Sequence, residues 1–142
     1  MTDIYTKEIT ELHQFFEDWF SAKLDKTQTK FARFADTVSE GFVLISPAGT
    51  LTHRTPLLEG LYEAHGNQPN SRLWIENVQV RYQDGDITLV IYEEWQDIDG
   101  KITARHSSAL FKTQVDTPNG IAWLHVHETW LPEYQPKTDS SA

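Results

Sequence analysis

The sequence predicts an α+β protein in which N-terminal helices pack on one face of a curved antiparallel sheet. Two observations lead to this fold class. In the first third of the chain, apolar residues recur at three- and four-residue steps, a spacing typical of amphipathic helices. From about residue 72 onward, apolar and polar residues alternate, and three Gly-containing segments interrupt the alternation, as in strands joined by hairpins.

The helical part is expected to begin with two helices. Residues 3–24 carry a single apolar stripe, which predicts the first helix. The stripe consists of Ile4, Ile9, Leu12, Phe15, Phe16, Trp19, Phe20 and Leu24. After the polar segment "DKTQTK", a shorter apolar pattern over residues 31–38 predicts a second helix that ends near Gly41.

A small hairpin and a short helix are expected next. The apolar run Phe42–Ser46 is closed by the turn residues "PAG", and "LTH" follows as a return strand. Thr55 is expected to cap a helix over residues 56–64, because its hydroxyl can accept a free backbone N–H. The proline that follows loses nothing at the first helical position.

Four long strands are expected in the rest of the chain, over residues 72–83, 87–97, 101–115 and 121–131. The breaks "DGD", "DIDGK" and "DTPNG" each contain glycine and predict tight hairpins, so the strands should form an antiparallel meander. Because 142 residues is a usual size for one core, residues 1–132 are expected to form a single domain. The polar residues 133–142 are expected to be a flexible tail.

The composition argues against several classes of function. With 21 acidic and 12 basic residues and a net charge of −9, the surface should repel nucleic acid. The chain has no cysteine, and therefore no disulfide, thiolate metal site or cysteine nucleophile. Without a basic leader or a run of about 20 apolar residues, we expect a cytoplasmic protein with no membrane partner. No phosphate-binding loop, nucleophile elbow or metal-ligand helix motif is present, so no cofactor is expected.

This order of elements, with "SSALFK" and "WLHVHETWLP" on the last two long strands, resembles the nuclear transport factor 2-like (NTF2-like) superfamily. The ending W-x-x-x-H-x-[ST], here Trp123, His127 and Thr129, is part of the resemblance, which covers about residues 4–132. The SnoaL-like and DUF4440 groups look most similar. The resemblance implies a cystatin-like α+β cone whose concave sheet face and helices enclose a cavity, and dimers formed through the outer sheet face. Some members are isomerases, dehydratases, cyclases or hydrolases, while others bind ligands or assemble larger proteins.

Turn lengths predict which side chains share the concave face. If a two-residue turn "DG" joins the first two long strands, Glu76 pairs with Glu93, and if a three-residue turn "IDG" follows, Glu93 pairs with Arg105. If Gly120 forms a bulge in the last hairpin, Ala109 pairs with Glu128. These pairings give a largely apolar concave face with four charges. It consists of Trp74, Glu76, Val78, Val80, Tyr82, Ile87, Leu89, Ile91, Glu93, Trp95, Arg105, Ser107, Ala109, Phe111, Leu124, Val126, Glu128 and Trp130.

The opposite face is mixed, but too aromatic for an ordinary solvent-facing surface, and a second subunit could cover it. The expected residues of a homodimer interface there are Tyr92, His106, Leu110, Trp123, His125 and His127. Three of these histidines could in principle bind zinc, but their cross-strand spacing looks too wide and no carboxylate ligand is clearly on that face. Subunit packing is therefore the preferred interpretation, and no metal is expected.

Glu76, Glu93 and Arg105 are the candidate catalytic group. Two carboxylates within about 5 Å raise each other's pKa and a guanidinium lowers both, so such a group can hold one proton-transferring carboxyl and one fixed anion. The alternative is a structural ion-pair network at the cavity mouth. The candidate ligand-binding residues are Trp19, Trp74, Trp95, Ser107, Glu128 and Trp130.

Glu128 leaves two interpretations open. A lone carboxylate deep on the concave face could bind a cationic or hydroxylated group of a ligand, or it could be satisfied by a helix residue such as Tyr62 or His65.

The leading functional hypothesis is the binding of a small molecule, ring-containing or amphiphilic, in an apolar cavity that contains carboxylates. One alternative is a cofactor-free isomerase or dehydratase that uses a cavity glutamate as general acid or base, because proton transfer needs only positioned carboxylates and a dry pocket. A second alternative is a dimeric assembly or stress-associated module without catalysis, in which the outer sheet face matters.

Overall fold

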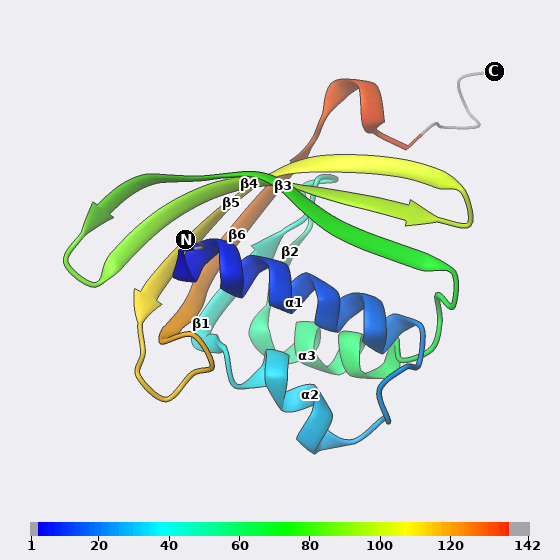
Figure 1. The fold of residues 1–142 in the computed structure, drawn as a ribbon, viewed down its shortest axis with the longest axis horizontal. Coiled ribbons are helices and arrows are strands. Elements are labelled where there is room, and N and C mark those ends of the chain that lie inside the picture. Colours follow the sequence, from blue (N-terminus) through cyan, green and yellow to red (C-terminus); the bar gives the residue numbers. More distant parts are fainter. Residues whose placement is uncertain (1–2, 137–142) are drawn as a thin grey trace.

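Three helices lie on one side of a curved six-stranded sheet within residues 3–136, which are the residues that the structure, a computed structural model, describes (Figure 1). The helices are α1 (Ile4–Phe20), α2 (Gln28–Ala35) and α3 (Arg54–Glu63). The strands are β1 (Val38–Ile45), β2 (Leu51–His53), β3 (Ser71–Asp84), β4 (Ile87–Ile98), β5 (Lys101–Thr113) and β6 (Ile121–Trp130), followed by a 3-10 turn, η1 (Pro132–Tyr134). The predicted α+β class and the predicted order of elements are confirmed.

Helix α1 lies along the concave face of the sheet. Asp3 caps its start by accepting a hydrogen bond from the backbone N–H of Thr6 at 2.7 Å. The helix ends at Phe20, four residues before the predicted end at Leu24, because Ala22 adopts a left-handed conformation with φ of 62°. The central residues of the predicted apolar stripe, including Ile9 and Leu12, are buried in the core.

The second helix is shorter than the sequence pattern suggested. It ends at Ala35, and Val38 already belongs to strand β1, so the expected end near Gly41 is wrong. The Thr37 hydroxyl donates to the carbonyls of Arg33 and Phe34 at the helix end. This local bond satisfies carbonyls that the next helical turn would have used, and the chain turns into the sheet.

Helix α3 begins at Arg54, one residue before the threonine that was expected to cap it. The residue at the cap position, His53, makes no side-chain capping bond. Instead, the Arg54 side chain donates to the backbone carbonyls of Val38 and Ala35, which ties the start of α3 to the connection between α2 and β1.

The sheet has the strand order β2-β1-β6-β5-β4-β3. The four long strands form the predicted antiparallel meander, and β1 pairs with β2 as the predicted small hairpin. Strand β1 also lies parallel to β6, which brings the first strand of the chain against the last. This pairing adds β1 and β2 to the meander beside β6, and α1, α2 and α3 all lie on the concave side of the resulting open sheet (Figure 1).

The turn between β4 and β5 decides which side chains face the helices. It contains two residues, Asp99 and Gly100, both with positive φ (53° and 85°), the conformation that an Asp-Gly hairpin favours. The expected three-residue turn is wrong, and Arg105 pairs with Glu94 instead of Glu93. Adjacent residues of a strand point to opposite faces of the sheet. This one-residue difference therefore exchanges the inward-facing and outward-facing side chains of β3 and β4 compared with the prediction, while most of those of β5 and β6 keep their predicted faces.

Strand β3 contains two register shifts, one between Glu76 and Gln79 and one between Val80 and Tyr82. Asn77, at the first shift, has a φ of 55°, as a bulged residue often does. The shifts change the pairing near the turn, while the predicted pairs of Glu76 with Glu93 and Trp74 with Trp95 are confirmed.

The last hairpin also differs from the prediction. Ala109 pairs with Val126, and the expected partner of Ala109, Glu128, pairs with Ser107. Because side chains alternate between the two faces, a shift of two residues leaves each side chain in this part of the hairpin on its predicted face. A register shift between Leu110 and Phe111 then places Trp123 on the inner side.

The core lies between α1, α2 and the sheet. Trp19 is fully buried at its centre, and its indole N–H donates to the carbonyl of Leu61 at 2.8 Å. Phe31 and Tyr62 pack against its ring at centroid distances of 5.0 and 5.5 Å. Side chains of α1, α2 and α3 thus hold the helical layer together beneath the sheet.

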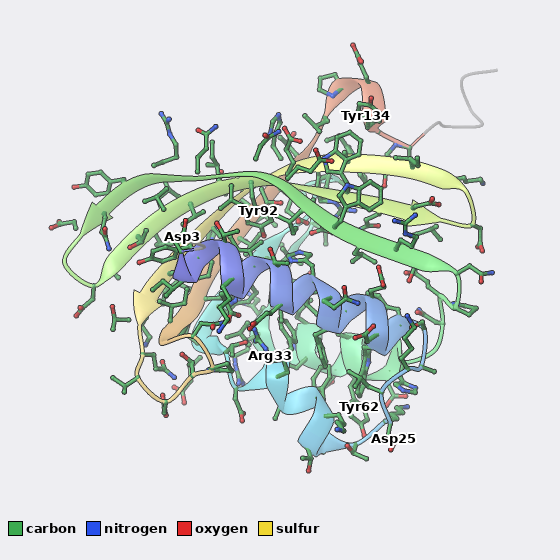
Figure 2. All side chains as sticks on the ribbon, in the orientation of Figure 1. Asp3, Asp25, Arg33, Tyr62, Tyr92 and Tyr134 are labelled. Atoms are coloured by element: carbon green, nitrogen blue, oxygen red, sulfur yellow. The ribbon has the colours of Figure 1, made fainter. Side chains whose placement is uncertain are left out.

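The segment after the last strand packs on the outer face of the sheet. Figure 2 shows Tyr134 of η1 on the side of the sheet opposite the helices, whereas Tyr92 lies on the helical side. Tyr134 packs against Trp95 with ring centroids 4.6 Å apart. The described part of the expected tail is therefore in contact with the sheet up to this residue, and residues 137–142 lie outside the described part of the chain. No helix among the described residues is long and apolar enough to cross a membrane.

Candidate functional site

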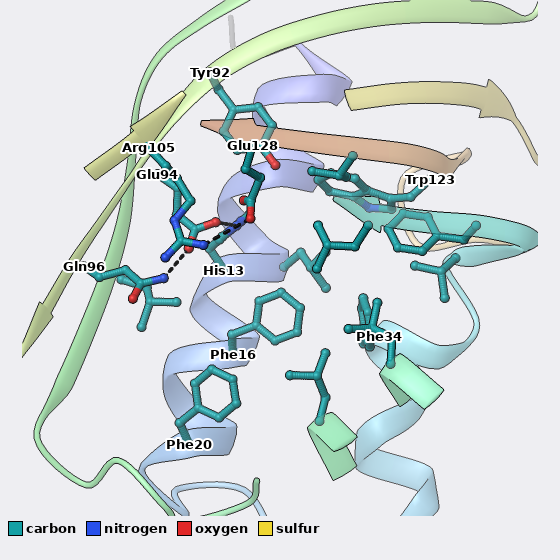
Figure 3. A pocket seen from close by; sticks show the side chains of 18 residues that line it. His13, Phe16, Phe20, Phe34, Tyr92, Glu94, Gln96, Arg105, Trp123 and Glu128 are labelled. Atoms are coloured by element: carbon teal, nitrogen blue, oxygen red, sulfur yellow. Dashed lines mark hydrogen bonds and ion pairs between the residues drawn. The ribbon is translucent and has the colours of Figure 1, made fainter. Parts of the chain in front are cut away.

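A cavity of about 180 Å³ lies between the helices and the concave face of the sheet (Figure 3). All three helices and strands β1, β3, β4, β5 and β6 contribute to its wall. Thirteen of its 18 lining residues are apolar or aromatic: Leu12, Phe16, Phe20, Phe34, Val38, Phe42, Leu44, Leu57, Leu61, Leu73, Tyr92, Trp123 and Val126. The cavity is thus formed where the apolar stripes of the helices meet the inner face of the sheet.

The other five lining residues are polar and gather at one end of the cavity, which we call the polar end (Figure 3). They are His13, Glu94, Gln96, Arg105 and Glu128. Only one of the five comes from a helix, and the sheet supplies the rest from three adjacent strands. The register of β4, β5 and β6 therefore determines the chemistry of the polar end.

His13 enters the cavity from α1. Its Nδ1 lies 2.8 Å from the carbonyl of Ile9 and donates to it, because a carbonyl can only accept. Its Nε2 lies 2.9 Å from Oε1 of Glu94, so a proton is shared along this contact. Burial lowers the pKa of His13, but the charge of Glu94 and its hydrogen bond outweigh this effect and raise the pKa above 6.5.

Glu94 is the partner of His13 on β4 and is only 7% exposed. Its second oxygen, Oε2, accepts a hydrogen bond from the side-chain amide of Gln96 at 2.6 Å. Burial raises the pKa of Glu94, but the charge and the hydrogen bond of His13, together with Arg105, lower it to about 2. Both pKa shifts favour an imidazolium paired with a carboxylate.

Glu128 of β6 is the second buried carboxyl of the polar end. Its Oε1 accepts from Nη1 of Arg105 at 3.1 Å, and its Oε2 accepts from the hydroxyl of Ser107 at 3.2 Å. Burial and the negative charge of Glu94 raise the pKa of Glu128 to about 7, although Arg105 opposes them. Glu128 can therefore gain or lose a proton near neutral pH.

Arg105 lies between the two carboxyls on β5. Burial lowers the pKa of its guanidinium, but Glu94 and Glu128 raise it, so Arg105 keeps its positive charge. Its guanidinium carbon lies 4.7 Å from the ring centroid of Trp130, a cation–π contact that helps to hold the side chain in place.

Tyr92 borders the same group and stays neutral, because burial and then the charges of Glu128 and Glu94 raise the pKa of its hydroxyl well above 10. The polar end thus combines a fixed ion pair, an arginine, a neutral hydroxyl and one carboxyl that titrates.

Two carboxyls whose pKa values are pushed apart in one apolar cavity can take different roles. Glu94 provides a permanent negative charge, and Glu128 can exchange a proton. Among residues 3–136, no three His, Cys, Asp or Glu side chains are grouped as a metal site would require. The side chains of the polar end can form hydrogen bonds, pair charges and transfer a proton.

The structure brings together some of the predicted site residues. Arg105 and Glu128 line the cavity, and Ser107 lies directly behind them in a hydrogen bond with Glu128. Trp130 stands beside Arg105. These four residues come from β5 and β6, where the sequence correctly predicted that they face inward.

Four other predicted residues lie on the outer face, away from the cavity: Trp74, Glu76, Glu93 and Trp95. The two rings stack with centroids 6.0 Å apart. The indole N–H of Trp74 donates to Glu76 at 2.9 Å, and that of Trp95 donates to Glu93 at 3.0 Å. The expectation that Glu76, Glu93 and Arg105 share the concave face is wrong, because it depended on the three-residue turn.

Of the other predicted ligand-binding and interface residues, some lie where they were expected and some do not. Trp19 was expected to bind ligand but lies in the core next to the cavity, without lining it. Tyr92 and Trp123 were expected on the outer face, and both line the cavity. The other four expected interface residues do lie on the outer side of β5 and β6: His106, Leu110, His125 and His127.

The sequence prediction missed His13, Glu94 and Gln96. One available signal was the position of His13, which stands one turn after Ile9 and three residues before Phe16, within the buried stripe of α1. A polar residue at that place requires a buried partner. The choice between the adjacent glutamates Glu93 and Glu94 depended on the turn, and neither residue alone indicated its face.

A further buried carboxylate supports the wall of the cavity. Glu8 is fully buried and accepts two hydrogen bonds from Arg33, at 3.2 and 2.9 Å. It also accepts from Asn119 and from the indole N–H of Trp123, each at 2.9 Å. This network joins α1, α2 and the sheet, and it fixes the Trp123 ring that lines the cavity.

The chain is similar in sequence to one protein family and to several known proteins. The model of one family, described as "Sucrose-6-phosphate phosphohydrolase C-terminal", matches residues 5–132. Probable sucrose-phosphatase 2 of Arabidopsis thaliana is 26% identical over 137 residues, covering 94% of this chain and 32% of the relative. Sucrose-phosphatase 2 of Nicotiana tabacum is 25% identical over 138 residues, covering 87% and 30%. The chain therefore spans about a third of the length of these relatives.

Solved structures show the fold. An NTF-2-like protein of unknown function from Pseudomonas aeruginosa has a TM-score of 0.80 at 21% identity, covering 89% of this chain and 98% of the other. An uncharacterised protein with a cystatin-like fold from Caulobacter vibrioides has a TM-score of 0.61 at 12% identity, covering 89% and 87%. The predicted NTF2-like, cystatin-like fold is confirmed, and the finer resemblance to the SnoaL-like and DUF4440 groups stays a prediction.

Proposed function

Because the chain belongs to the sucrose-6-phosphate phosphohydrolase C-terminal family and has an NTF2-like fold, we propose that it is a ligand-binding module. Its cavity would hold a small molecule with one ring, with the polar group of that molecule at the polar end. The observation that carries this proposal is the placement of five polar side chains at one end of an otherwise apolar cavity.

The size of the cavity limits the ligand. A volume of about 180 Å³ is close to the roughly 150 Å³ of an engineered apolar cavity that binds benzene. The ring of the ligand would lie among the phenylalanines and leucines of the helices. A hydroxyl, carbonyl or carboxyl group would then reach the hydrogen-bonding groups of Arg105 and Glu128.

The charges of the polar end argue against a phosphate ester as the ligand. The two cations among the lining residues, His13 and Arg105, each already contact a carboxylate, Glu94 and Glu128 respectively. A phosphate group with nearly two negative charges would meet both buried carboxyls without a free counter-charge. The activity in the names of the longer relatives therefore gives no direct guide to the ligand of this cavity.

Ligand binding can be tested with the purified chain and a variant that fills the cavity. Leu61→Trp places a large ring in the cavity from α3, while Leu58→Trp is the matched control, because Leu58 lies on the same helix but outside the cavity lining. A neutral single-ring probe such as 2-phenylethanol should bind the natural chain and Leu58→Trp, but not Leu61→Trp. Equal binding to both variants, measured by calorimetry, would refute binding in this cavity.

A second candidate function is a cofactor-free enzyme that transfers protons, such as an isomerase or dehydratase. The pKa of Glu128, raised to about 7 by burial and Glu94, is the observation that favours it, since a general acid or base works best near the ambient pH. In this version Glu128 takes the catalytic role first expected for Glu93 and Glu76, and Arg105 orients the substrate. Glu128→Gln would then abolish turnover of a substrate while leaving its binding intact.

We also propose that the chain forms a homodimer through the outer face of the sheet. Leu110 and His125 are only partly buried there, and Trp74, Trp95 and Tyr134 form an accessible aromatic group on the same face. Covering such a face would remove aromatic surface from water. If the dimer alone were the function, filling the cavity would have no physiological consequence, which distinguishes an assembly module from a binding module.

A further inference from the structure

The hydrogen bonds of the polar end leave a specific group unused. Each oxygen of Glu94 and of Glu128 already accepts one hydrogen bond from the protein. Arg105, in contrast, uses Nη1 alone. Its Nε is buried and has no partner among the described residues, and no bond from Nη2 is present there either. Arg105 therefore has donors to spare at the polar end, and an acceptor on a ligand would satisfy them.

The unused donors share one edge of the guanidinium. Nε and Nη2 point in parallel, and this edge of an arginine matches the two oxygens of a carboxylate. Trp130 occupies one side of the guanidinium, whose carbon lies 4.7 Å from the ring centroid, so a ligand would approach Arg105 from the cavity. Nη2 is the donor that a carboxylate would contact first, because Nε has almost no accessible surface. A small shift of the guanidinium toward the ligand would then give the buried Nε–H a partner, whose absence otherwise costs free energy.

We propose that the cavity binds a single-ring monocarboxylic acid, whose carboxylate pairs with the free edge of Arg105 while Glu128 takes up a proton from the solvent. This inference rests on the proposed function, and it names the chemical class of the ligand. The ring would occupy the apolar part of the cavity, and the ligand's carboxylate would replace that of Glu128 as the counter-ion of Arg105.

The charges around Glu128 are consistent with this exchange. His13 of α1 holds Glu94 of β4 as an ion pair, and Tyr92 of β4 is neutral. Arg105 of β5 is then the remaining cation at the polar end. Helices α2 and α3 and strand β1 contribute apolar side chains alone to the lining, so they add no charge. Once Glu128 is protonated, the polar end has one positive charge to spare, which suits a monoanion.

The pH dependence of binding follows from Glu128. Its pKa of about 7 means that most of the chain carries a protonated Glu128 at pH 6 and a small fraction does so at pH 8. If only the protonated form binds the carboxylate, the apparent affinity falls about tenfold between these two pH values. An ordinary carboxylic acid ligand is ionised at both, so its own titration does not contribute.

The experiment compares three probes that share a ring and a side-chain length but differ in charge: phenylacetate, 2-phenylethanol and 2-phenylethylamine. Calorimetric titrations of the purified chain at pH 6 should rank phenylacetate first and the amine last. At pH 8, the affinity for phenylacetate should be about tenfold lower, while that for the alcohol should change little.

Variants assign the effect to the two residues. Glu128→Gln mimics the protonated carboxyl, so it should bind phenylacetate at pH 8 as tightly as the natural chain does at pH 6. Arg105→Gln combined with Glu128→Gln removes the guanidinium without leaving a buried carboxylate unpaired, and it should lose the preference for phenylacetate over the alcohol. Glu59→Gln, an exposed glutamate of α3, is the control and should behave as the natural chain.

The possible outcomes separate the two proposals. If 2-phenylethanol binds and phenylacetate has no advantage, or the amine binds most tightly, the inference fails and the proposed binding function stands. If the pH dependence persists in Glu128→Gln, then another group such as His13 is responsible and the proton uptake by Glu128 is refuted. If no probe binds, the proposed function fails, and the inference fails with it.

Discussion

The two faces of strand β4 carry neighbouring glutamates in opposite environments. Glu94 points into the cavity, is 7% exposed and pairs with His13. Glu93 points to the outer face, where it accepts hydrogen bonds from Asn77 and the indole of Trp95. Both carboxylates are hydrogen-bonded. Burial raises the pKa of Glu94, but the charge and hydrogen bond of His13, together with Arg105, outweigh it and lower this pKa to about 2. Enclosure by the helices, and not the residue type, creates the chemically distinct site.

Replacing each of the two glutamates by glutamine should show the largest difference between the faces. Glu94→Gln removes the counter-charge of a buried histidine, and breaking a buried ion pair costs roughly 3–5 kcal/mol of the free energy of unfolding. Glu93→Gln affects a partly exposed position on the outer face and should cost within about 0.5 kcal/mol. Urea denaturation at pH 7 measures both. Similar losses in the two variants would mean that the faces do not differ as described.

The next effect is the pH dependence of stability that Glu128 contributes. Its pKa rises from 4.5 to about 7 on folding, so the stability it adds is complete below pH 4.5 and is lost as the pH rises through about 7. Glu128→Gln should therefore equal the natural chain near pH 5 and exceed its free energy of unfolding by on the order of 2–3 kcal/mol at pH 8.

Chemical denaturation of both proteins at the two pH values tests this prediction. The contribution of His13, which also changes in this range, is present in both proteins and largely cancels in their difference. A variant that is less stable than the natural chain at pH 8 would show that Arg105 stabilises the Glu128 carboxylate more than burial destabilises it.

A smaller effect is expected from the aromatic pair on the outer face. Trp74 and Trp95 stack with their ring centroids 6.0 Å apart and are only partly buried. A double-mutant cycle with Trp74→Ala and Trp95→Ala should give a coupling free energy of about 0.5–1.5 kcal/mol. Binding of a probe in the cavity should be unchanged in both single variants, and a loss of binding in either would connect the two faces.

Substitutions that introduce charges on the outer face are expected to change the fold of the single chain least. His127 is exposed and Leu110 is partly buried, so His127→Glu and Leu110→Glu should leave the helical layer intact. If the outer face forms the homodimer, buried like charges at the interface should yield monomers in analytical ultracentrifugation. An unaltered sedimentation profile for both variants would refute this dimer.

Much of the fold followed from periodicity. The helical stripe of α1, the four long strands and the hairpin positions were all readable, because each element has one buried side. The end of α2 was not, since the carbonyl-capping bonds of Thr37 are a local contact that leaves no periodic pattern. The parallel pairing of β1 with β6 joins distant parts of the chain and also left no local signal.

The candidate site was predicted on β5 and β6 and missed on β4. Arg105 and Glu128 were correctly assigned to the cavity face, because the pairing of β5 with β6 differs from the predicted pairing by two residues, which leaves each side chain on the same face. Glu94 was missed because one residue in the turn at Asp99 and Gly100 decides whether it or Glu93 faces inward. The Asp-Gly pair did favour a two-residue turn, so this error could have been avoided.

The five tryptophans of the chain allow one measurement that compares the two faces directly. Trp123 lines the cavity, while Trp74 and Trp95 lie on the outer face. In a proton–nitrogen correlation spectrum, each indole N–H gives its own signal, which Trp→Phe substitutions can assign. On titration with 2-phenylethanol, the signal of Trp123 should shift and those of Trp74 and Trp95 should stay in place. A shift of Trp74 and Trp95 without one of Trp123 would contradict a binding cavity on the concave face.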